Sequence, residues 1–162
     1  MYITGKYWGN LIGDTDDSLT LMDYLSEKGK AEVDVREILA DFGLDRLEGD
    51  FRAPEVPIVY TDEEGWETDI HFAIDLVTDL AALLLECKVS GGVDLGELGG
   101  GEASGPLRIT AGSEEHALVD RTLQDFAAQP LRYDPYLSEL VPEEDMRALA
   151  ALCAELREEL YG

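Results

Sequence analysis

The sequence predicts an α+β fold in which a small, mostly antiparallel sheet packs on a buried helix, with C-terminal helices after it. Three observations lead to this fold class. The run Asp75–Cys87 is apolar on nearly every side, as in a helix at the centre of a core. Two shorter runs, 57–60 and 66–72, have the composition or the alternation of strands. Residues 113–162 contain two further helical patterns.

The N-terminal part is expected to begin with a strand and a helix. Residues 2–8 alternate β-branched and aromatic residues with small ones, a pattern typical of a strand. After a polar turn, Asp17 or Ser18 is placed to cap a helix that runs to about Lys28. Gly29 then ends this helix, because glycine readily takes the left-handed conformation of many helix C-termini.

A short helix and a hairpin are expected next. Asp34, with Glu37 three residues later, forms an Asp variant of the capping box and predicts a helix after it. Residues 57–60 have the composition of a strand, and the alternation of 66–72 has the period of a half-buried strand. The turn 62–65 between them makes the two strands a hairpin.

The start of the apolar run allows two interpretations. His71, Asp75 and Asp79 are four residues apart, so one helix covering all three would place them on one face, where they could ligate a metal. The alternation before Ala73 instead places His71 on a strand. Asp75 is then the N-cap of the core helix, and Asp79 lies in its first turns. We therefore expect no metal site here.

A glycine-rich segment divides the chain. Residues 90–105 hold seven glycines in 16 positions and offer no evident apolar anchors. We expect a flexible loop between an α+β core, residues 1–89, and a strand with helices, residues 106–162, that packs on the same core.

The segment after this loop is expected to add a strand and two helices. Residues 106–111 have strand composition, and Ser113 is placed to cap a helix that Pro130 stops. Pro142 stands in the first turn of a final helix reaching Leu160. The apolar stripe of that helix consists of Met146, Leu149, Leu152, Cys153, Leu156 and Leu160.

Negative charge dominates the composition. The 162 residues include 36 acidic and 12 basic side chains, a net charge of −24. Residues 1–81 carry 20 acids and 6 bases, and residues 82–162 carry 16 and 6, so the folded body itself is negative. Such a field repels nucleic acid and anionic membranes and attracts basic proteins. The alternative is that the charge serves solubility alone.

The location of the protein is expected to be cytoplasmic. Residues 1–8 show no basic stretch followed by a long apolar run, so no signal peptide is evident. Cys87 and Cys153 are too few and too far apart for a disulfide framework, and they are interpreted as buried free thiols.

The acidic turn after Gly13 is weak evidence for a metal. The alternating carboxylates of Asp14, Asp16 and Asp17 suggest a calcium loop, but the EF-hand pattern then needs glycine and glutamate where this chain has Leu19 and Leu25. The simpler interpretation is a set of acids that favours the N-terminus of the following helix.

No catalytic residue and no cofactor are expected. The glycine-rich segment lacks the spacings that cradle phosphate, and the surrounding negative charge disfavours a phosphate ligand. His71 and His116 are the only histidines, and neither lies in a recognisable pairing with a nucleophile.

Three stretches carry a family resemblance. The stretches Tyr7–Leu19, Ile70–Asp75 and Leu83–Cys87 make residues 1–95 similar to small bacterial immunity proteins of polymorphic toxin and contact-dependent inhibition systems. The resemblance implies a cytoplasmic, non-enzymatic and often acidic protein. Such a protein binds a cognate toxin domain and blocks its active site or an adjacent surface, and it has no catalytic residues.

The resulting hypothesis is an immunity-type inhibitor that binds a basic toxin domain. The alternative is an acidic adaptor or nucleic-acid mimic that regulates another basic protein, and a third is a metal-dependent enzyme. The predicted binding surface combines the acidic turn with the hairpin tip, namely Trp8, Asn10, Asp14, Asp16, Asp17, Asp62, Glu63 and Glu64. A second surface to consider is the acidic face of the final helix, with Glu144, Glu155, Glu158 and Glu159.

Overall fold

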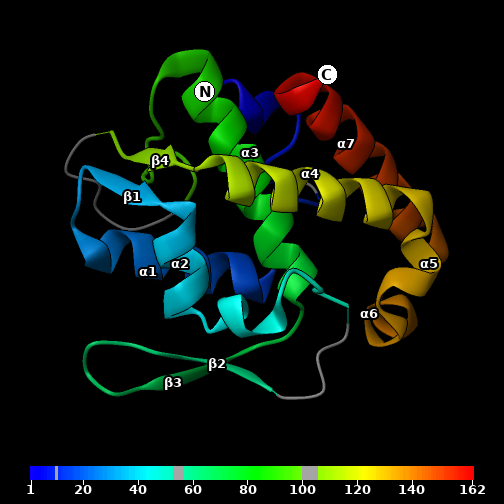
Figure 1. Cartoon of the computed structure of the whole chain (residues 1–162), viewed down its shortest axis with the longest axis horizontal. Coiled ribbons are helices and arrows are strands. Elements are labelled where there is room, and N and C mark those ends of the chain that lie inside the picture. Colours follow the sequence, from blue (N-terminus) through cyan, green and yellow to red (C-terminus); the bar gives the residue numbers. More distant parts are fainter. Residues whose placement is uncertain (10, 53–56, 100–105) are drawn as a thin grey trace.

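Helix α3 (Ala73–Ser90) forms the centre of the molecule, and every residue from Ala73 to Glu86 is buried. The computed structural model describes residues 1–9, 11–52, 57–99 and 106–162. The other helices surround α3 (Figure 1). The predicted apolar core helix and the α+β fold class are therefore confirmed.

The start of α3 differs from the prediction. Its N-cap is Phe72, so Asp75 lies inside the first turn and is buried. The expected role of Asp75 as N-cap is wrong, because a side chain from another helix supplies the acceptor at this end. The carboxylate of Asp17 accepts the backbone N–H groups of His71 and Phe72, both at 2.9 Å.

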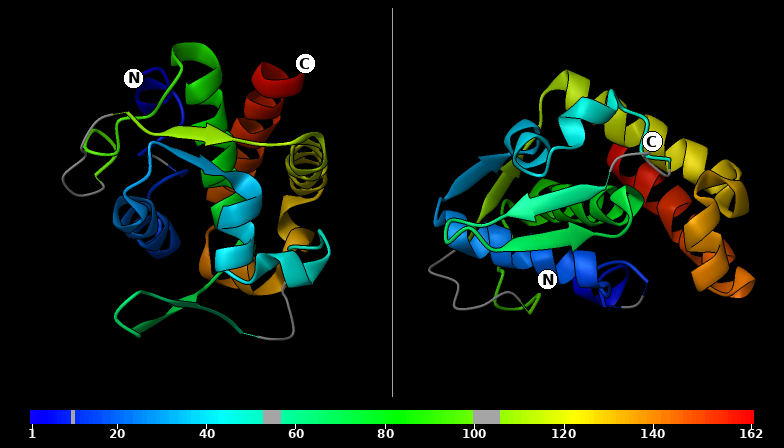
Figure 2. Two further views of the ribbon diagram at one scale, coloured as in Figure 1. Left: turned by 60° about the vertical axis from the view of Figure 1, so that its left-hand side comes forward. Right: turned by 90° about the horizontal axis from the view of Figure 1, so that it is seen from below.

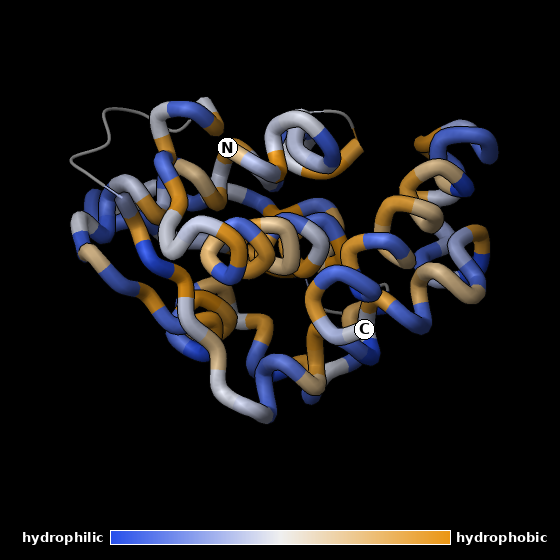
Figure 3. Tube along the Cα trace, turned by 90° about the horizontal axis from the view of Figure 1, so that it is seen from above, coloured by the Kyte–Doolittle hydropathy of each residue, from blue (hydrophilic) through white to orange (hydrophobic). Residues whose placement is uncertain are grey.

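Three long helices pack on α3. Helix α1 (Asp16–Lys28) packs against it, as do α4 (Ser113–Ala128) and α7 (Glu143–Tyr161), which also run against each other. Along the outer helices, hydrophilic and hydrophobic residues alternate (Figure 3). Each therefore turns one apolar face to the core. The predicted helices over 18–28, 113–128 and the C-terminal segment are confirmed. Their predicted caps are wrong: the N-cap of α1 is Thr15 and not Asp17 or Ser18, and α4 begins at Ser113 itself, after Gly112.

The final helix buries the predicted stripe, in which Leu152 alone is only partly buried. Two short helices, α5 (Pro130–Tyr133) and α6 (Pro135–Leu140), lead into it. Both cysteines are free. Cys153 is buried as predicted, whereas Cys87 is half-buried. Within the described ranges, no helix is both long and apolar enough to cross a bilayer.

The strands form two separate pairs. Strands β2 (Ile58–Thr61) and β3 (Glu67–Ile70) form the predicted antiparallel hairpin, which lies across the end of the molecule where α3 begins (Figure 2). Strands β1 (Glu32–Asp34) and β4 (Arg108–Thr110) pair in parallel, with Val33 opposite Ile109. The expectation of a single, mostly antiparallel sheet is thus corrected, because β4 pairs with a strand far away in the sequence.

Helix α2 (Val35–Asp41) follows β1 directly, and a one-turn helix, η2 (Leu44–Leu47), follows α2. Asp34 caps α2 as predicted, accepting the backbone N–H of Arg36 at 2.9 Å. Glu37 does not complete a capping box. Its carboxylate is instead held by Lys28 at 2.8 Å and Lys30 at 2.7 Å.

The N-terminal strand is not formed. A single turn of 3-10 helix, η1 (Ile3–Gly5), occupies this place, and the N–H groups of Tyr7 and Trp8 both bond to the carbonyl of Ile3. The backbone N–H of Ile3 donates to the buried carboxylate of Glu86 at 3.0 Å. The aromatic alternation thus serves a tight turn that docks on α3. The two termini lie at the same end of the molecule (Figure 1), where Tyr2 and Tyr7 donate hydrogen bonds to Glu159.

The described part of the glycine-rich segment has apolar anchors. Val93, Leu95 and Leu98 are all buried, and Val93 forms an antiparallel bridge with Leu107. The expectation that this segment lacks anchors is therefore wrong for residues 90–99. Residues 100–105, on which the rest of the flexible-loop prediction falls, lie outside the described residues. The division of the chain at this segment stays a prediction.

Candidate functional site

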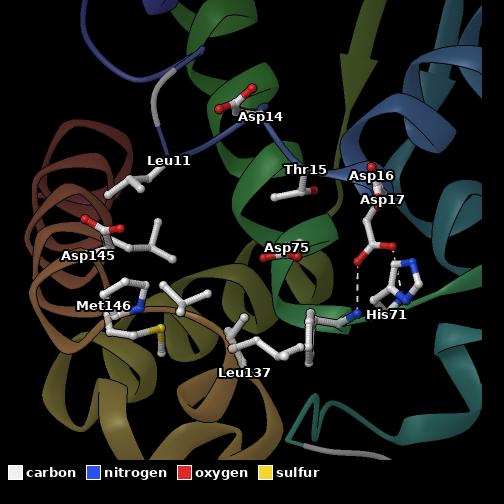
Figure 4. Close-up of a pocket in the computed structure, with 15 residues that line it drawn as sticks. Leu11, Asp14, Thr15, Asp16, Asp17, His71, Asp75, Leu137, Asp145 and Met146 are labelled. Carbon is white, nitrogen blue, oxygen red and sulfur yellow. Dashed lines mark hydrogen bonds between the residues drawn. The ribbon is translucent and has the colours of Figure 1, made fainter.

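A cleft of about 580 Å³ opens between the first turn of α1, the start of α3 and the connection from α6 to α7 (Figure 4). Its edge and floor carry five carboxyl groups, and one wall is apolar. The acids are Asp14, Asp16, Asp17, Asp75 and Asp145. The apolar wall includes Leu11, Leu137, Leu140, Val141, Met146 and Leu149. Among the described residues, no Lys or Arg lines it.

Asp17 ties the two helices of the cleft together. It lies in the first turn of α1 and is 1% exposed. Its carboxylate accepts the backbone N–H groups of His71 and Phe72, and so fixes the point at which α3 begins. A charged acceptor placed on the otherwise unpaired N–H groups at the start of a helix is strongly stabilising. Asp17 is therefore a structural part of the cleft.

Asp79 makes a second connection, about two turns further along α3. Its carboxyl accepts the N–H of Gly13 at 2.9 Å and the hydroxyl of Ser18 at 2.6 Å. Ser18 and the N-cap Thr15 form a capping box that begins α1. Burial raises the pKa of Asp79 to about 7, although the two donors lower it. The loop that carries Asp14 is thus held onto α3.

Gly13 is required by this arrangement. Its φ of +78° lies in the left-handed region, and a Cβ atom there would overlap the ring of Trp8. We expect Gly13→Ala to lower the free energy of unfolding by about 2 kcal/mol, through backbone strain and displacement of the ring. Gly9→Ala is the matched control, because Gly9 has a φ of +90° but open space around it. Urea denaturation should give a loss of only about 1 kcal/mol for the control, and equal losses would contradict the packing argument.

Asp75 differs from both neighbouring carboxyl groups. It is 8% exposed and lies on the floor of the cleft (Figure 4). Within the described residues, no N–H or hydroxyl group donates to its carboxyl. Burial raises the pKa of Asp75 to about 8, and the charges of Asp17 and Asp79 act in the same direction. Asp75 is therefore largely protonated at neutral pH in the free protein.

The predicted acidic turn is split by the structure. Asp14 and Asp16 are exposed at the edge of the cleft, whereas Asp17 is buried beneath it. Trp8 is only 8% exposed and packs over Gly13, so it is not the exposed aromatic residue that the sequence suggested. Asn10 lies outside the described residues. That these residues contact a partner stays a prediction.

The hairpin tip is a separate surface. Asp62 accepts the backbone N–H groups of Glu64 and Trp66, both at 2.9 Å, and thereby shapes the turn. Asp62 and Glu63 line a smaller hollow with Tyr60, and none of these residues lines the cleft. Trp66, which directly precedes β3, is 71% exposed. The acidic face of α7 is also distinct from the cleft, and its Glu159 is held by Tyr2, Tyr7 and Lys6.

Several cleft residues escaped the sequence interpretation. The sequence pattern places Asp75 at a helix cap, and Asp145 is not among the residues of the predicted binding surface. Leu140, which is 74% exposed, belongs to a short helix that was not expected at all. One available signal was the presence of two aspartates in the most apolar helix of the chain, since buried carboxyl groups are rare without a specific reason.

Comparison with known proteins gives one family. A family model described as Immunity protein 68 matches residues 2–160. No curated protein and no solved structure matches the chain. In the described residues, no group of three or more His, Cys, Asp or Glu side chains is arranged to hold a metal ion.

Proposed function

Because the chain belongs to the immunity protein 68 family, we propose that it binds a cognate toxin domain and neutralises it by non-covalent protein–protein contact. The resemblance predicted from residues 1–95 is confirmed at the level of the family, and the match extends through the glycine-rich segment and the C-terminal helices. The partner, the binding surface and the non-enzymatic mode of action belong to the proposal.

The observation that supports contact through the cleft is its combination of an apolar wall with an acidic edge. Exposed Leu140 and partly exposed Leu11 and Val141 give a partner apolar surface to cover. Asp14, Asp16 and Asp145 stand around them. Interfaces are commonly built as an apolar centre inside a polar rim. A concave surface of this kind is suited to a protruding part of a basic protein.

The charge of the whole molecule supports a basic partner. Within the part of the chain that the structure describes, seven of the 12 Lys and Arg side chains form ion pairs with acids of the same molecule. Because the 36 acids outnumber the 12 bases, such pairing leaves the net charge of −24 in place. Such a field accelerates encounter with a basic protein and repels nucleic acid. The toxin surface that meets the cleft is expected to be rich in Arg and Lys.

The test compares two variants that remove the same charge. Asp14→Asn, Asp16→Asn and Asp145→Asn together neutralise three acids at the cleft. Glu63→Gln, Glu64→Gln and Glu67→Gln neutralise three exposed acids at the hairpin. Cells that express the toxin domain encoded beside the gene should survive with the wild-type protein. Calorimetry should show at least a tenfold, or about 1.4 kcal/mol, loss of toxin affinity for the cleft variant.

The controls separate the possible outcomes. The hairpin variant should lose much less affinity, and both variants should keep the wild-type melting temperature within a few degrees. Loss of affinity in the hairpin variant alone would place the interface at the hairpin, where Trp66 is exposed. Failure of the wild-type protein to protect cells or bind the toxin would contradict the proposed function itself.

A further inference from the structure

Among the strongly buried acids at the start of α3, Asp75 is the one whose carboxyl receives no N–H or hydroxyl donor from the described residues; its neighbour is the carboxyl of Asp17. Asp17 accepts two backbone N–H groups, and Asp79 accepts one N–H and one hydroxyl. Asp75 is more than nine-tenths buried, yet no donor from the described residues reaches its carboxyl. Burying a carboxyl beside the charges of Asp17 and Asp79 costs free energy when Asp75 is ionised, so this position disfavours folding at higher pH. Functional sites often keep a destabilising residue because that residue contributes to binding.

The surroundings of Asp75 define what it could bind. The cleft above it has an apolar wall formed by Leu137, Met146 and Leu149, and an acidic edge that includes Asp14 and Asp145 (Figure 4). An anion would meet several carboxylates and no Lys or Arg. An apolar side chain would cover the wall but would bury the Asp75 carboxyl further without supplying a donor to it. A cation on an apolar stem satisfies both parts of the cleft.

Arginine fits these requirements better than lysine. Its guanidinium offers five N–H donors in a planar fork, which can bond a carboxyl and still reach a second acceptor. It is also more weakly hydrated than an ammonium group, so moving it into a partly dry cleft is easier. The aliphatic part of the side chain would lie on the apolar wall. Arginine is among the residues that contribute most to protein interfaces.

We propose that the cleft receives an arginine side chain of the partner, whose guanidinium donates to Asp75 while its methylene groups pack against Leu137 and Met146. This inference rests on the proposed function and names the chemistry of the contact. It places the centre of the interface at the floor of the cleft. Asp14 and Asp145 at the edge then attract the approaching cation and accept hydrogen bonds from its outer N–H groups.

Binding of arginine to Asp75 is expected to be coupled to the loss of a proton. The carboxyl of Asp75 is mostly protonated at neutral pH in the free protein, and a guanidinium beside it favours the ionised form. Arginine binding should therefore release a proton from Asp75 to solvent. Other titratable groups surround Asp75. They are Asp17 on α1, His71 before α3, Asp79 on α3, Asp134 before α6, and Asp145 and Cys153 on α7.

The test uses a small probe and its neutral isostere. N-acetyl-L-arginine amide is titrated into the isotopically labelled full-length protein, and the amide signals of residues 71–79 and 137–149 are followed by NMR. N-acetyl-L-citrulline amide is the matched control, because it has nearly the same shape without the charge. We expect the arginine compound to bind with a Kd on the order of millimolar and the citrulline compound at least tenfold more weakly.

Two variants complete the test. Asp75→Asn should weaken arginine binding at least tenfold while keeping the amide spectrum of a folded protein. The hairpin variant with Glu63→Gln, Glu64→Gln and Glu67→Gln should bind as the wild type does. Equal binding of the two compounds, an unchanged response in Asp75→Asn, or no response at roughly ten times the expected Kd would overturn the inference. The protection of cells from the toxin is measured separately, so failure of the proposed function is distinguishable from failure of this contact.

Discussion

Replacing Asp17 with alanine is expected to lower the free energy of unfolding by about 4 kcal/mol. The carboxylate accepts two backbone N–H groups at the start of the central helix, and hydrogen bonds to charged groups contribute about 1.5–3 kcal/mol each. Its removal leaves the N–H groups of His71 and Phe72 without their acceptor in a partly buried place. Chemical denaturation monitored by circular dichroism measures this loss.

Asp16→Ala provides the matched control. Asp16 is the preceding residue and also lies in the first turn of α1, but it is exposed and its carboxylate accepts no hydrogen bond within the described residues. Only its interaction with the helix dipole is lost, about 0.3–1 kcal/mol. Comparable losses for the two variants would show that the two hydrogen bonds of Asp17 do not hold α3 in place.

Replacing Asp75 with asparagine is expected to stabilise the protein, increasingly so at higher pH. The pKa of Asp75 is raised from 3.8 to about 8 in the folded state. Because this pKa is raised, the contribution of Asp75 to stability is most favourable below about pH 4 and is lost as the pH rises toward 8. One pKa unit corresponds to about 1.4 kcal/mol. The advantage of the variant over the wild type should therefore grow by about 2–4 kcal/mol between pH 5 and pH 8.

Asp79→Asn is the comparison for this effect. Asp79 is also buried, with a pKa raised to about 7, but two donors bond its carboxyl. Asparagine cannot accept from both Gly13 and Ser18 in the same way, so this variant should lose stability at pH 5. Unfolding free energies at several pH values decide the matter. A constant difference between Asp75→Asn and the wild type across this range would mean that Asp75 is not held protonated.

The elements defined by local pattern were predictable from the sequence. The apolar run predicted the central helix, and the alternation before it, with the turn 62–65, predicted the hairpin. Asp34 predicted the start of α2. The strand expected over 2–8 was wrong because an alternating pattern of aromatic residues also suits a tight turn docked on a helix. The pairing of β1 with β4 joins residues 76 positions apart, such as Val33 and Ile109, and no local pattern reports such a contact.

The candidate site was predictable only at its edge. Asp14 and Asp16 were identified as exposed acids, and both lie at the cleft. Asp75 was missed because the start of α3 is fixed by Asp17, a carboxylate from another helix. With α3 beginning at Ala73, Asp75 moves from a cap into the buried first turn. Trp8, which the prediction placed in the binding surface, is buried instead, since burial depends on which segments pack together.

The affinity of Asp75→Asn for the toxin, measured beside its stability, tests the central claim most directly. If the cleft binds the toxin through Asp75, the variant is more stable than the wild type at pH 8 and binds the toxin at least tenfold more weakly. Loss of both stability and affinity would indicate a structural role for Asp75. Increased stability with unchanged affinity would contradict the account and place the toxin-binding surface outside the cleft.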